Sequence, residues 1–226
     1  MSVLSIRGLI AATALAFGAS AGVAAPVSAV DVAKAPAIYG SNYWNAGFRF
    51  TANTDLDVVA LGNYDYQQNG FLFGSNLPGR AEIGLFDLTG NLLASATING
   101  AEGYLVGAFR YLDLLSPVRL SAASDYVIAT WSNDPRFYFK SDWQAHLGGS
   151  LGVTVDDRIA LKGDLDSGRG TGLAFPTISR TDALANIGPN MLIDAVQPAP
   201  VPVPAAGVML VTALGGLAVA RRRKRA

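Results

Sequence analysis

The sequence predicts an all-β protein whose central region, residues 30–196, folds as an antiparallel β-sandwich of the jelly-roll or immunoglobulin-like kind. Three observations predict this class. Short runs rich in β-branched and aromatic residues recur about ten residues apart. Glycine supplies 25 of the 226 residues, above the usual ~7%, as expected of a chain with many turns. No long stretch of the region has the period of an amphipathic helix.

The strands follow one another along the first part of this region. In Phe48-Arg49-Phe50 and Phe109-Arg110-Tyr111, two aromatic residues flank an arginine, which is the alternation of a half-buried strand. We therefore expect the aromatic side chains to face the core and the arginines to face away. The predicted strands are residues 47–51, 57–63, 80–86, 92–98, 105–112, 118–120 and 126–131.

The best-defined turn is Asp87-Leu88-Thr89-Gly90, with aspartate at its first position and glycine at its fourth. These residue types suit a type I turn closed by a left-handed residue, so the turn is expected to join residues 83–86 to 92–98 as a hairpin. Asn99-Gly100 and residues 121–125 mark the next turns. A domain of ~165 residues can bury an adequate core without disulfides.

Composition excludes several classes of site. The chain has no cysteine, which excludes disulfides, thiol catalysis and cysteine-bound zinc or iron–sulfur clusters. Seventeen basic residues balance seventeen acidic ones, but six of the basic residues lie near the two ends. The remaining body has a charge of about −6, which does not favour nucleic acid as a partner. The single histidine, His146, does not favour a conventional catalytic triad.

The N-terminus has the order of a secretory signal peptide: Arg7, an uncharged stretch over residues 8–25, and then small residues. Val27 and Ala29 occupy the −3 and −1 positions of a cut after Ala29, so the signal peptide is predicted to span residues 1–29. A cut after Ala25 fits the same rule but would place Pro26 directly after it.

A retained membrane helix is the alternative for this segment. Gly18, Gly22 and Pro26 interrupt the run, which favours removal. A single arginine, rather than a pair, favours the general secretion route over the twin-arginine route.

The C-terminus combines three features in sequence. Residues 197–204 hold four prolines and are expected to form an extended polyproline-type linker. The uncharged, mostly apolar residues 205–220 would span about 24 Å as a helix, short of the roughly 30 Å hydrocarbon core. Arginine side chains can close part of this gap by reaching the interface. A basic tail, residues 221–226, follows and is expected on the cytoplasmic side. A buried core helix is the alternative.

This arrangement resembles the PEP-CTERM protein-sorting signals of Gram-negative bacteria, in the form that carries a VPLPA motif. The resemblance covers residues 200–226 and places Val203 where leucine is usual. It implies recognition by an exosortase, a membrane-embedded processing enzyme, and cleavage near the motif. The corresponding motif residues are Val201, Pro202, Val203, Pro204 and Ala205. The corresponding basic stop signal is Arg221, Arg222, Arg223, Lys224 and Arg225.

A second resemblance covers residues 46–132. The stretch at residues 84–97 resembles a β-sandwich domain of unknown function that is common in exported bacterial proteins. Residues 60–62, 109–111, 117–118 and 126–128 support it, whereas residues 122–125 lack the glycine-containing turn that is commoner in the family. The family has no accepted catalytic residues, so this resemblance implies a fold and no site.

Two acidic pairs are candidate sites. Asp164 and Asp166 alternate ahead of Gly168, as at the start of a calcium loop, but that loop needs an oxygen ligand at its fifth position and a later glutamate. A solvated turn is therefore favoured here. Asp156 and Asp157 could serve glycoside hydrolysis, but neighbouring residues on a strand point to opposite faces and cannot flank one bond.

Aromatic residues give the remaining candidate site. Exposed Trp131 and Trp143 could form a sugar-stacking platform, whereas the alternative is that these rings fill the sandwich. His146, beside Trp143, is expected to pack in a loop. No nucleophile elbow, phosphate-binding loop or dinucleotide fingerprint is present, so the sequence predicts a protein without enzymatic activity and without a cofactor.

The sequence therefore predicts an exported cell-envelope or extracellular-matrix protein with a structural or adhesive role. A carbohydrate-binding module acting on exopolysaccharide is the alternative, and a secreted hydrolase is less favoured. The expected partners are the general secretion machinery, signal peptidase, an exosortase and the membrane. The body is expected in the periplasm, held at the inner membrane, and then at the cell surface or outside the cell after processing.

Overall fold

Strands and tight turns make up almost all of the chain that the structure describes, as the glycine-rich, strand-like sequence predicts. The computed structural model describes residues 25–33, 43–73, 77–135, 139–142, 153–179 and 184–195. All of them lie in one folded unit, residues 24–197. Within these ranges the sole helical element is the 3₁₀ turn η1 (Tyr66–Gln68), and none is a helix long and apolar enough to cross a bilayer.

One sheet has five strands, and both ends of the described chain belong to it. Its strands all pair antiparallel. In order across the sheet they are β1 (Val27–Ser28), β17 (Pro189–Ala195), β4 (Leu56–Tyr64), β10 (Phe109–Leu120) and β9 (Tyr104–Val106).

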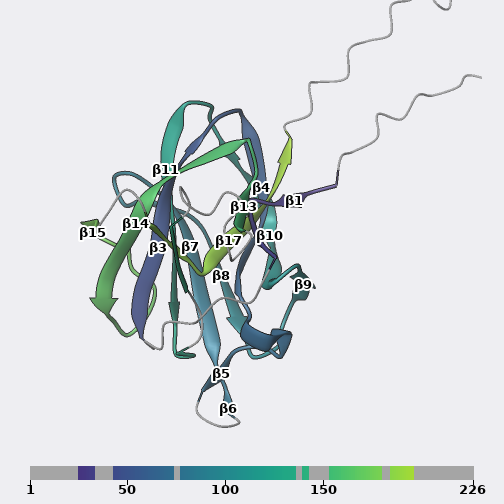
Figure 1. Ribbon diagram of the computed structural model, residues 1–226, viewed down its shortest axis with the longest axis vertical. Coiled ribbons are helices and arrows are strands. Elements are labelled where there is room, and N and C mark those ends of the chain that lie inside the picture. Colours follow the sequence, from purple (N-terminus) through teal and green to yellow (C-terminus); the bar gives the residue numbers. More distant parts are fainter. Residues whose placement is uncertain are drawn as a thin grey trace, which may run out of the picture. The chain divides into compact units, whose positions relative to one another are not determined.

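The other sheet has six strands, also antiparallel throughout, and can be followed in Figure 1. Three two-stranded ribbons complete the described part of the unit. The six strands are, in order, β15 (Ile178–Ser179), β14 (Ile159–Arg169), β3 (Trp44–Ala52), β11 (Ser124–Ser132), β7 (Arg80–Asp87) and β8 (Leu92–Asn99). The ribbons pair β2 (Val30–Val32) with β13 (Val153–Val155), β5 (Leu72–Phe73) with β6 (Leu77–Pro78), and β12 (Phe139–Asp142) with β16 (Leu184–Ile187).

The main hydrophobic core of the described residues lies between the two sheets. Phe48 and Ile83 from the six-stranded sheet join Val58, Tyr111 and Ile193 from the five-stranded sheet in one cluster of buried side chains. A shared core of this kind is what two packed antiparallel sheets form. The prediction of an all-β, antiparallel, sandwich-like fold is therefore confirmed for the described chain.

The predicted hairpin turn is present. Gly90 has φ +88°, and Asp87 Oδ1 accepts hydrogen bonds from the backbone N–H groups of Thr89 at 2.8 Å and Asn91 at 3.0 Å. The carboxylate thus supplies acceptors for N–H groups that would otherwise face only water. β7 and β8 pair as the sequence predicts.

The predicted strand at residues 105–112 is wrong as a single element. β9 ends at Val106, and Gly107 adopts φ +59° in a turn before β10 begins at Phe109. β10 then continues to Leu120, so it absorbs the separate strand predicted at residues 118–120. Its pairing with β4 shifts register between Asp113 and Val118, which marks an irregularity of the β-bulge type.

The five-stranded sheet begins earlier in the chain than the sequence predicts. β1 contains Val27 and Ser28, which the sequence analysis assigned to the signal peptide. Val27 pairs with Ile193 and Ser28 with Leu192 of β17. Ala29 is fully buried, and its N–H donates to the carbonyl of Met191 at 2.9 Å. These residues are therefore part of the folded unit.

Candidate functional site

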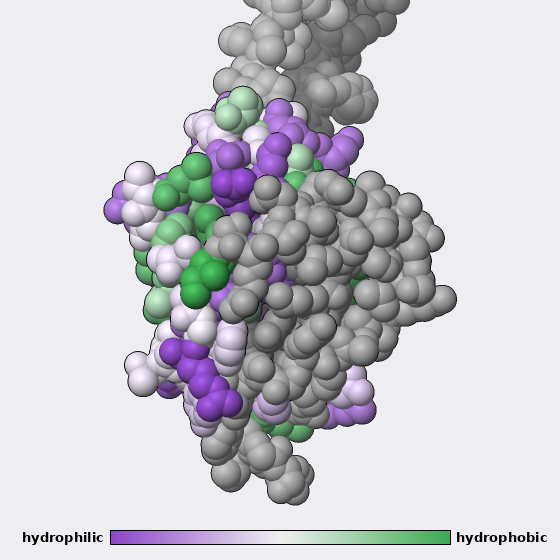
Figure 2. Space-filling model, turned by 60° about the vertical axis from the view of Figure 1, so that its left-hand side comes forward, coloured by the Kyte–Doolittle hydropathy of each residue, from purple (hydrophilic) through white to green (hydrophobic). Residues whose placement is uncertain are grey.

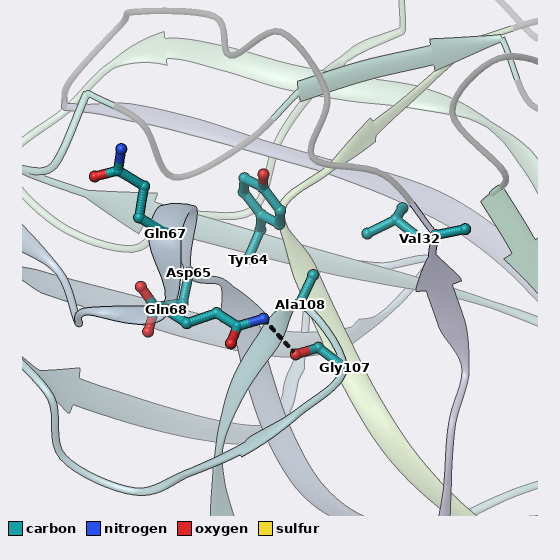
Figure 3. A pocket seen from close by; sticks show the side chains of 8 residues that line it. Val32, Tyr64, Asp65, Gln67, Gln68, Gly107 and Ala108 are labelled. Carbon is teal, nitrogen blue, oxygen red and sulfur yellow. Dashed lines mark hydrogen bonds between the residues drawn. The ribbon is translucent and has the colours of Figure 1, made fainter.

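A hollow of about 390 Å³ lies where β4 ends and the turn between β9 and β10 passes beside it. Figure 3 shows its walls: η1 and the end of β4 on one side, the β9–β10 turn below, and Val32 opposite. Its lining is formed by Val32, Ala33, Tyr64, Asp65, Gln67, Gln68, Gly107 and Ala108.

A buried ion pair holds one wall of this hollow. Arg110 Nε donates to Asp65 Oδ2 at 2.8 Å, and their side chains are 7% and 0% exposed. Asp65 also accepts from the backbone N–H of Gly70 at 3.0 and 3.1 Å, while Arg110 Nη1 donates to the carbonyl of Ala101 at 2.9 Å. The pair therefore joins the residue before η1, the turn after β8 and the start of β10.

Arg110 points away from the core, as the alternation of the strand predicts, but it is buried. Phe109 and Tyr111 point into the core, and both are fully buried. Arg110 points away from the core, but the 65–70 loop and Ala101 cover that face, so it is not exposed to water. Neither Arg110 nor Asp65 was predicted as a site residue. The signals that could have found them are a charge in mid-strand between two aromatics and an acid between Tyr64 and Tyr66.

Two adjacent glutamines form the outer rim of the hollow. Gln67 and Gln68 have φ +64° and +58°, which is left-handed backbone that costs a non-glycine residue about 1 kcal/mol. Both side chains are exposed, and Gln68 Nε2 donates to the carbonyl of Gly107 at 3.3 Å. Their carboxamides offer neutral donors and acceptors, which suit a ligand that carries hydroxyl groups.

Two ionisable residues line the hollow, Tyr64 and Asp65. Tyr64 is 2% exposed, and burial, followed by the nearby Tyr66 and Asp65, raises its pKa to about 12. Its hydroxyl therefore stays protonated near neutral pH. The carboxylate of Asp65 already binds Arg110 and Gly70.

Residues 170–177, which we name the strap, cross the outer face of the six-stranded sheet. Trp131 lies beneath the strap. Its Nε1–H donates to the carbonyl of Gly170 at 2.9 Å, the Arg80 guanidinium lies 5.1 Å from its ring centroid, and it is 3% exposed. In this arrangement its faces form no open stacking surface for a sugar. Trp143 and His146 lie outside the described residues.

Two polar side chains of the sheet fix the strap. Asn45 donates through Nδ2 to the carbonyl of Gly172 at 3.1 Å and accepts from the N–H of Ala174 at 2.7 Å. Glu82 Oε2 accepts from the N–H of Leu173 at 2.9 Å. Figure 2 turns the left-hand side of Figure 1 forward, and on the described part of that face hydrophobic residues lie beside hydrophilic ones.

The structure places the two acidic pairs differently from expectation. Asp164 and Asp166 are 0% and 3% exposed within β14, paired with Phe48 and Ala46 of β3, so the expected solvated turn is wrong. The pairing of β14 with β3 shifts register twice, between Leu161 and Gly163 and between Asp166 and Gly168. Among the described residues, no three acidic or histidine side chains are grouped to hold a metal ion.

Asp156 and Asp157 lie in the turn after β13, not on a strand as assumed. Asp156 Oδ1 accepts from Arg158 Nε at 2.8 Å, and the hydrogen bond from Arg158 lowers the pKa of Asp156 below its ordinary value. Asp156 thus stabilises the turn in which it lies.

The sorting motif, from Val201 to Ala205, and the basic cluster, from Arg221 to Arg225, lie outside the described residues, as does the segment 205–220. Comparison with models of known protein families gives no match, and comparison with curated proteins gives none either. The two family resemblances therefore rest on the residues quoted for them.

Proposed function

We propose that this chain is an exported protein of the Gram-negative cell envelope or extracellular matrix, with a structural or adhesive role and no enzymatic activity. One observation carries the proposal. A proline motif, an uncharged apolar segment and a cluster of basic residues follow one another over the last part of the chain. Exosortase-type sorting signals have this order, and an amphipathic core helix would have a polar face that residues 205–220 lack.

The proposed route has two processing steps. The general secretion machinery exports the chain, and signal peptidase removes the N-terminal segment. Residues 205–220 then hold the body in the periplasm, with the basic cluster on the cytoplasmic side. An exosortase cuts near the motif and releases the domain to the cell surface or the medium. β17 ends at Ala195, so a cut at residues 201–205 would leave the sheet complete.

The proposed structural or adhesive role does not depend on catalysis. Asp65 and Arg110 serve the fold, and Tyr64 has its pKa raised to about 12, far from the range of a catalytic acid or base at neutral pH. For the finer fold class we propose a β-sandwich of the jelly-roll or immunoglobulin-like kind. The connections from β3 to β4 and from β10 to β11 cross from one sheet to the other, as they do in jelly rolls and in immunoglobulin-like sandwiches.

Intact-mass spectrometry of the protein from its native host tests the sorting step, with membrane and medium analysed separately. The expected species in the medium ends near residues 201–205. A Pro202→Ala/Pro204→Ala variant should stay in the membrane with its tail uncut, because the motif is lost. Pro198→Ala, in the same linker but outside the motif, is the matched control and should be processed normally. A wild-type protein that keeps Arg221 to Arg225 in the membrane would contradict sorting.

A glycan-binding role remains the second candidate, now at the hollow and not at Trp131. Two consecutive left-handed glutamines favour it, since strained backbone is commoner at binding sites than elsewhere. The test is a glycan array that includes the host's exopolysaccharide. Gln67→Ala/Gln68→Ala should weaken binding about tenfold or more, whereas Leu88→Ala, an exposed residue at a different turn, should leave it unchanged. No glycan bound by the wild type would exclude this role.

A further inference from the structure

Ser28 ties the first strand to the interior of the sandwich. Its hydroxyl lies 2.8 Å from the hydroxyl of Tyr111, accepts from Asn190 Nδ2 at 3.0 Å and donates to the carbonyl of Val30 at 2.6 Å. Tyr111 and Asn190 are fully buried. A chain without Ser28 would leave the buried Tyr111 hydroxyl without this partner, and buried polar groups are costly when they are not hydrogen-bonded.

Ala29 and Val30 are equally bound into the fold. Both are fully buried, the N–H of Ala29 donates to the carbonyl of Met191, and the carbonyl of Ala29 accepts from the N–H of Asp156 at 3.0 Å. A cut after Ala29 would delete both of these hydrogen bonds. It would also turn the nitrogen of Val30 into a charged ammonium group inside the protein, where a charge is far less stable than in water.

We propose that signal peptidase cuts ahead of β1, after Ala24 or Ala25, and that the mature chain keeps β1. This inference rests on the proposed export. Small residues satisfy the −3 and −1 positions at both bonds: Gly22 and Ala24 for the first, Val23 and Ala25 for the second. The cut after Ala24 also avoids having Pro26 directly behind the bond. The mature chain therefore begins at Ala25 or Pro26 and not at Val30.

The exposure of the residues at the start of β1 and just before it fits this position. Ala25 and Pro26 are exposed and Val27 is 39% exposed, so a new charged terminus at residue 25 or 26 stays in water. Proline has no N–H to offer a partner strand and is tolerated at the first residue of a strand or just before it.

The mass of the exported protein's N-terminal peptide, recovered from the native host, tests the inference. An N-terminus at Ala25 or Pro26 is expected. An N-terminus at Val30 overturns the inference and leaves the proposed export standing. A protein that is found only in the cytoplasm with Met1 and the whole leader retained overturns the proposed function itself, and the cut with it.

Two variants separate the competing bonds. Ala24→Leu/Ala25→Leu removes the small −1 residue from both proposed sites and should cause the uncut precursor to accumulate. Val27→Phe blocks the −3 position of a cut after Ala29 only, at an exposed site of the fold, and should be processed like the wild type. Normal processing of Ala24→Leu/Ala25→Leu together with blocked processing of Val27→Phe would overturn the inference.

A stability measurement on the exported protein gives a second readout. Ser28→Ala should lower the urea midpoint by about 0.5 M, because Tyr111 loses its partner. In a Tyr111→Phe background, the same change should lower the midpoint less. If residue 28 leaves with the signal peptide, the exported Ser28→Ala protein is identical to the wild type, and an unchanged midpoint overturns the inference.

Discussion

Asp65 joins three segments of the chain: its own loop, the turn after β8 and the start of β10. Its carboxylate binds Arg110 of β10 and the N–H of Gly70, and through Arg110 it is linked to the carbonyl of Ala101. The two charges are almost completely removed from water. Each of them depends on the other, because a buried charge that loses its partner keeps its desolvation penalty.

Arg110→Leu should lower the free energy of unfolding by ~3–5 kcal/mol, since Asp65 would stay buried without its cation. Urea unfolding of the purified protein measures this. Arg119→Leu is the matched control on the same strand. Arg119 pairs with Asp55 at 3.1 Å, but both side chains are more than half exposed, so little change is expected. Equal effects of the two substitutions would contradict the role given to the buried pair.

Asp87 predicts a pH dependence. Hydrogen bonds from Thr89 and then from Asn91 lower its pKa to about 2, from an ordinary value of 3.8. The ionised form is therefore favoured by folding, and its contribution is present above about pH 4 and lost as the pH falls to about 2. Wild type and Asp87→Ala should differ in urea midpoint at neutral pH and converge near pH 2. A gap that persists at pH 2 would contradict this.

These two aspartates show which residues the sequence could and could not reveal. The role of Asp87 follows from its neighbours, since Gly90 completes the turn only three residues later. The role of Asp65 depends on Arg110, 45 residues away, which no local pattern predicts. Arg110 also shows that alternation predicts the direction of a side chain, but not whether a loop will cover it.

At the level of strands, one close contact sets the packing of the five-stranded sheet. Gly62 of β4 lies opposite Tyr111 of β10, and a Cβ atom at Gly62 would lie 2.3 Å from the Tyr111 ring and 2.7 Å from the carbonyl oxygen of Arg110. The absent side chain makes room for the ring, which can then reach Ser28 of β1. Through the Tyr111 ring, Gly62 thus affects the position of the edge strand β1, although β17 lies between β4 and β1.

Gly62→Ala should destabilise the domain by ~1–3 kcal/mol, because the added methyl group displaces the ring or the backbone. Gly172→Ala in the strap is the control, since its Cβ would come within 3.4 Å only of the flexible end of Glu82. Thermal unfolding followed by circular dichroism compares the two. A milder effect at Gly62 than at Gly172 would contradict this reading of the contact.

Element boundaries were predictable where the turn residues were unambiguous. The β7–β8 hairpin follows from Asp87 and Gly90, and the structure has it. Gly107 sits inside an apolar run in which glycine could belong to a strand or to a turn, so the sequence did not reveal that β9 and β10 are separate.

On the scale of the whole domain, the sequence predicts the all-β class but not the assignment of strands to sheets. β14 pairs with β3 and β17 pairs with β4, so the last described strands complete sheets begun by the first. Such pairings depend on contacts between residues far apart in the chain, which spacing and composition do not encode. The hollow was missed for the same reason, because η1 and the β9–β10 turn meet only in the folded state.

The pairing of β1 with β17 brings the two ends of the sandwich together, at the edge of one sheet (Figure 1). The first and last strands of the described chain are therefore neighbours. Moving the chain termini to another loop should leave every strand pairing possible. A circular permutant that joins Ala195 to Val27 through a short glycine-rich linker, with new ends between Leu88 and Thr89, should give the near-ultraviolet circular dichroism spectrum of the wild type. A permutant without that spectrum would mean that the order of the strands along the chain, and not their contacts alone, specifies this fold.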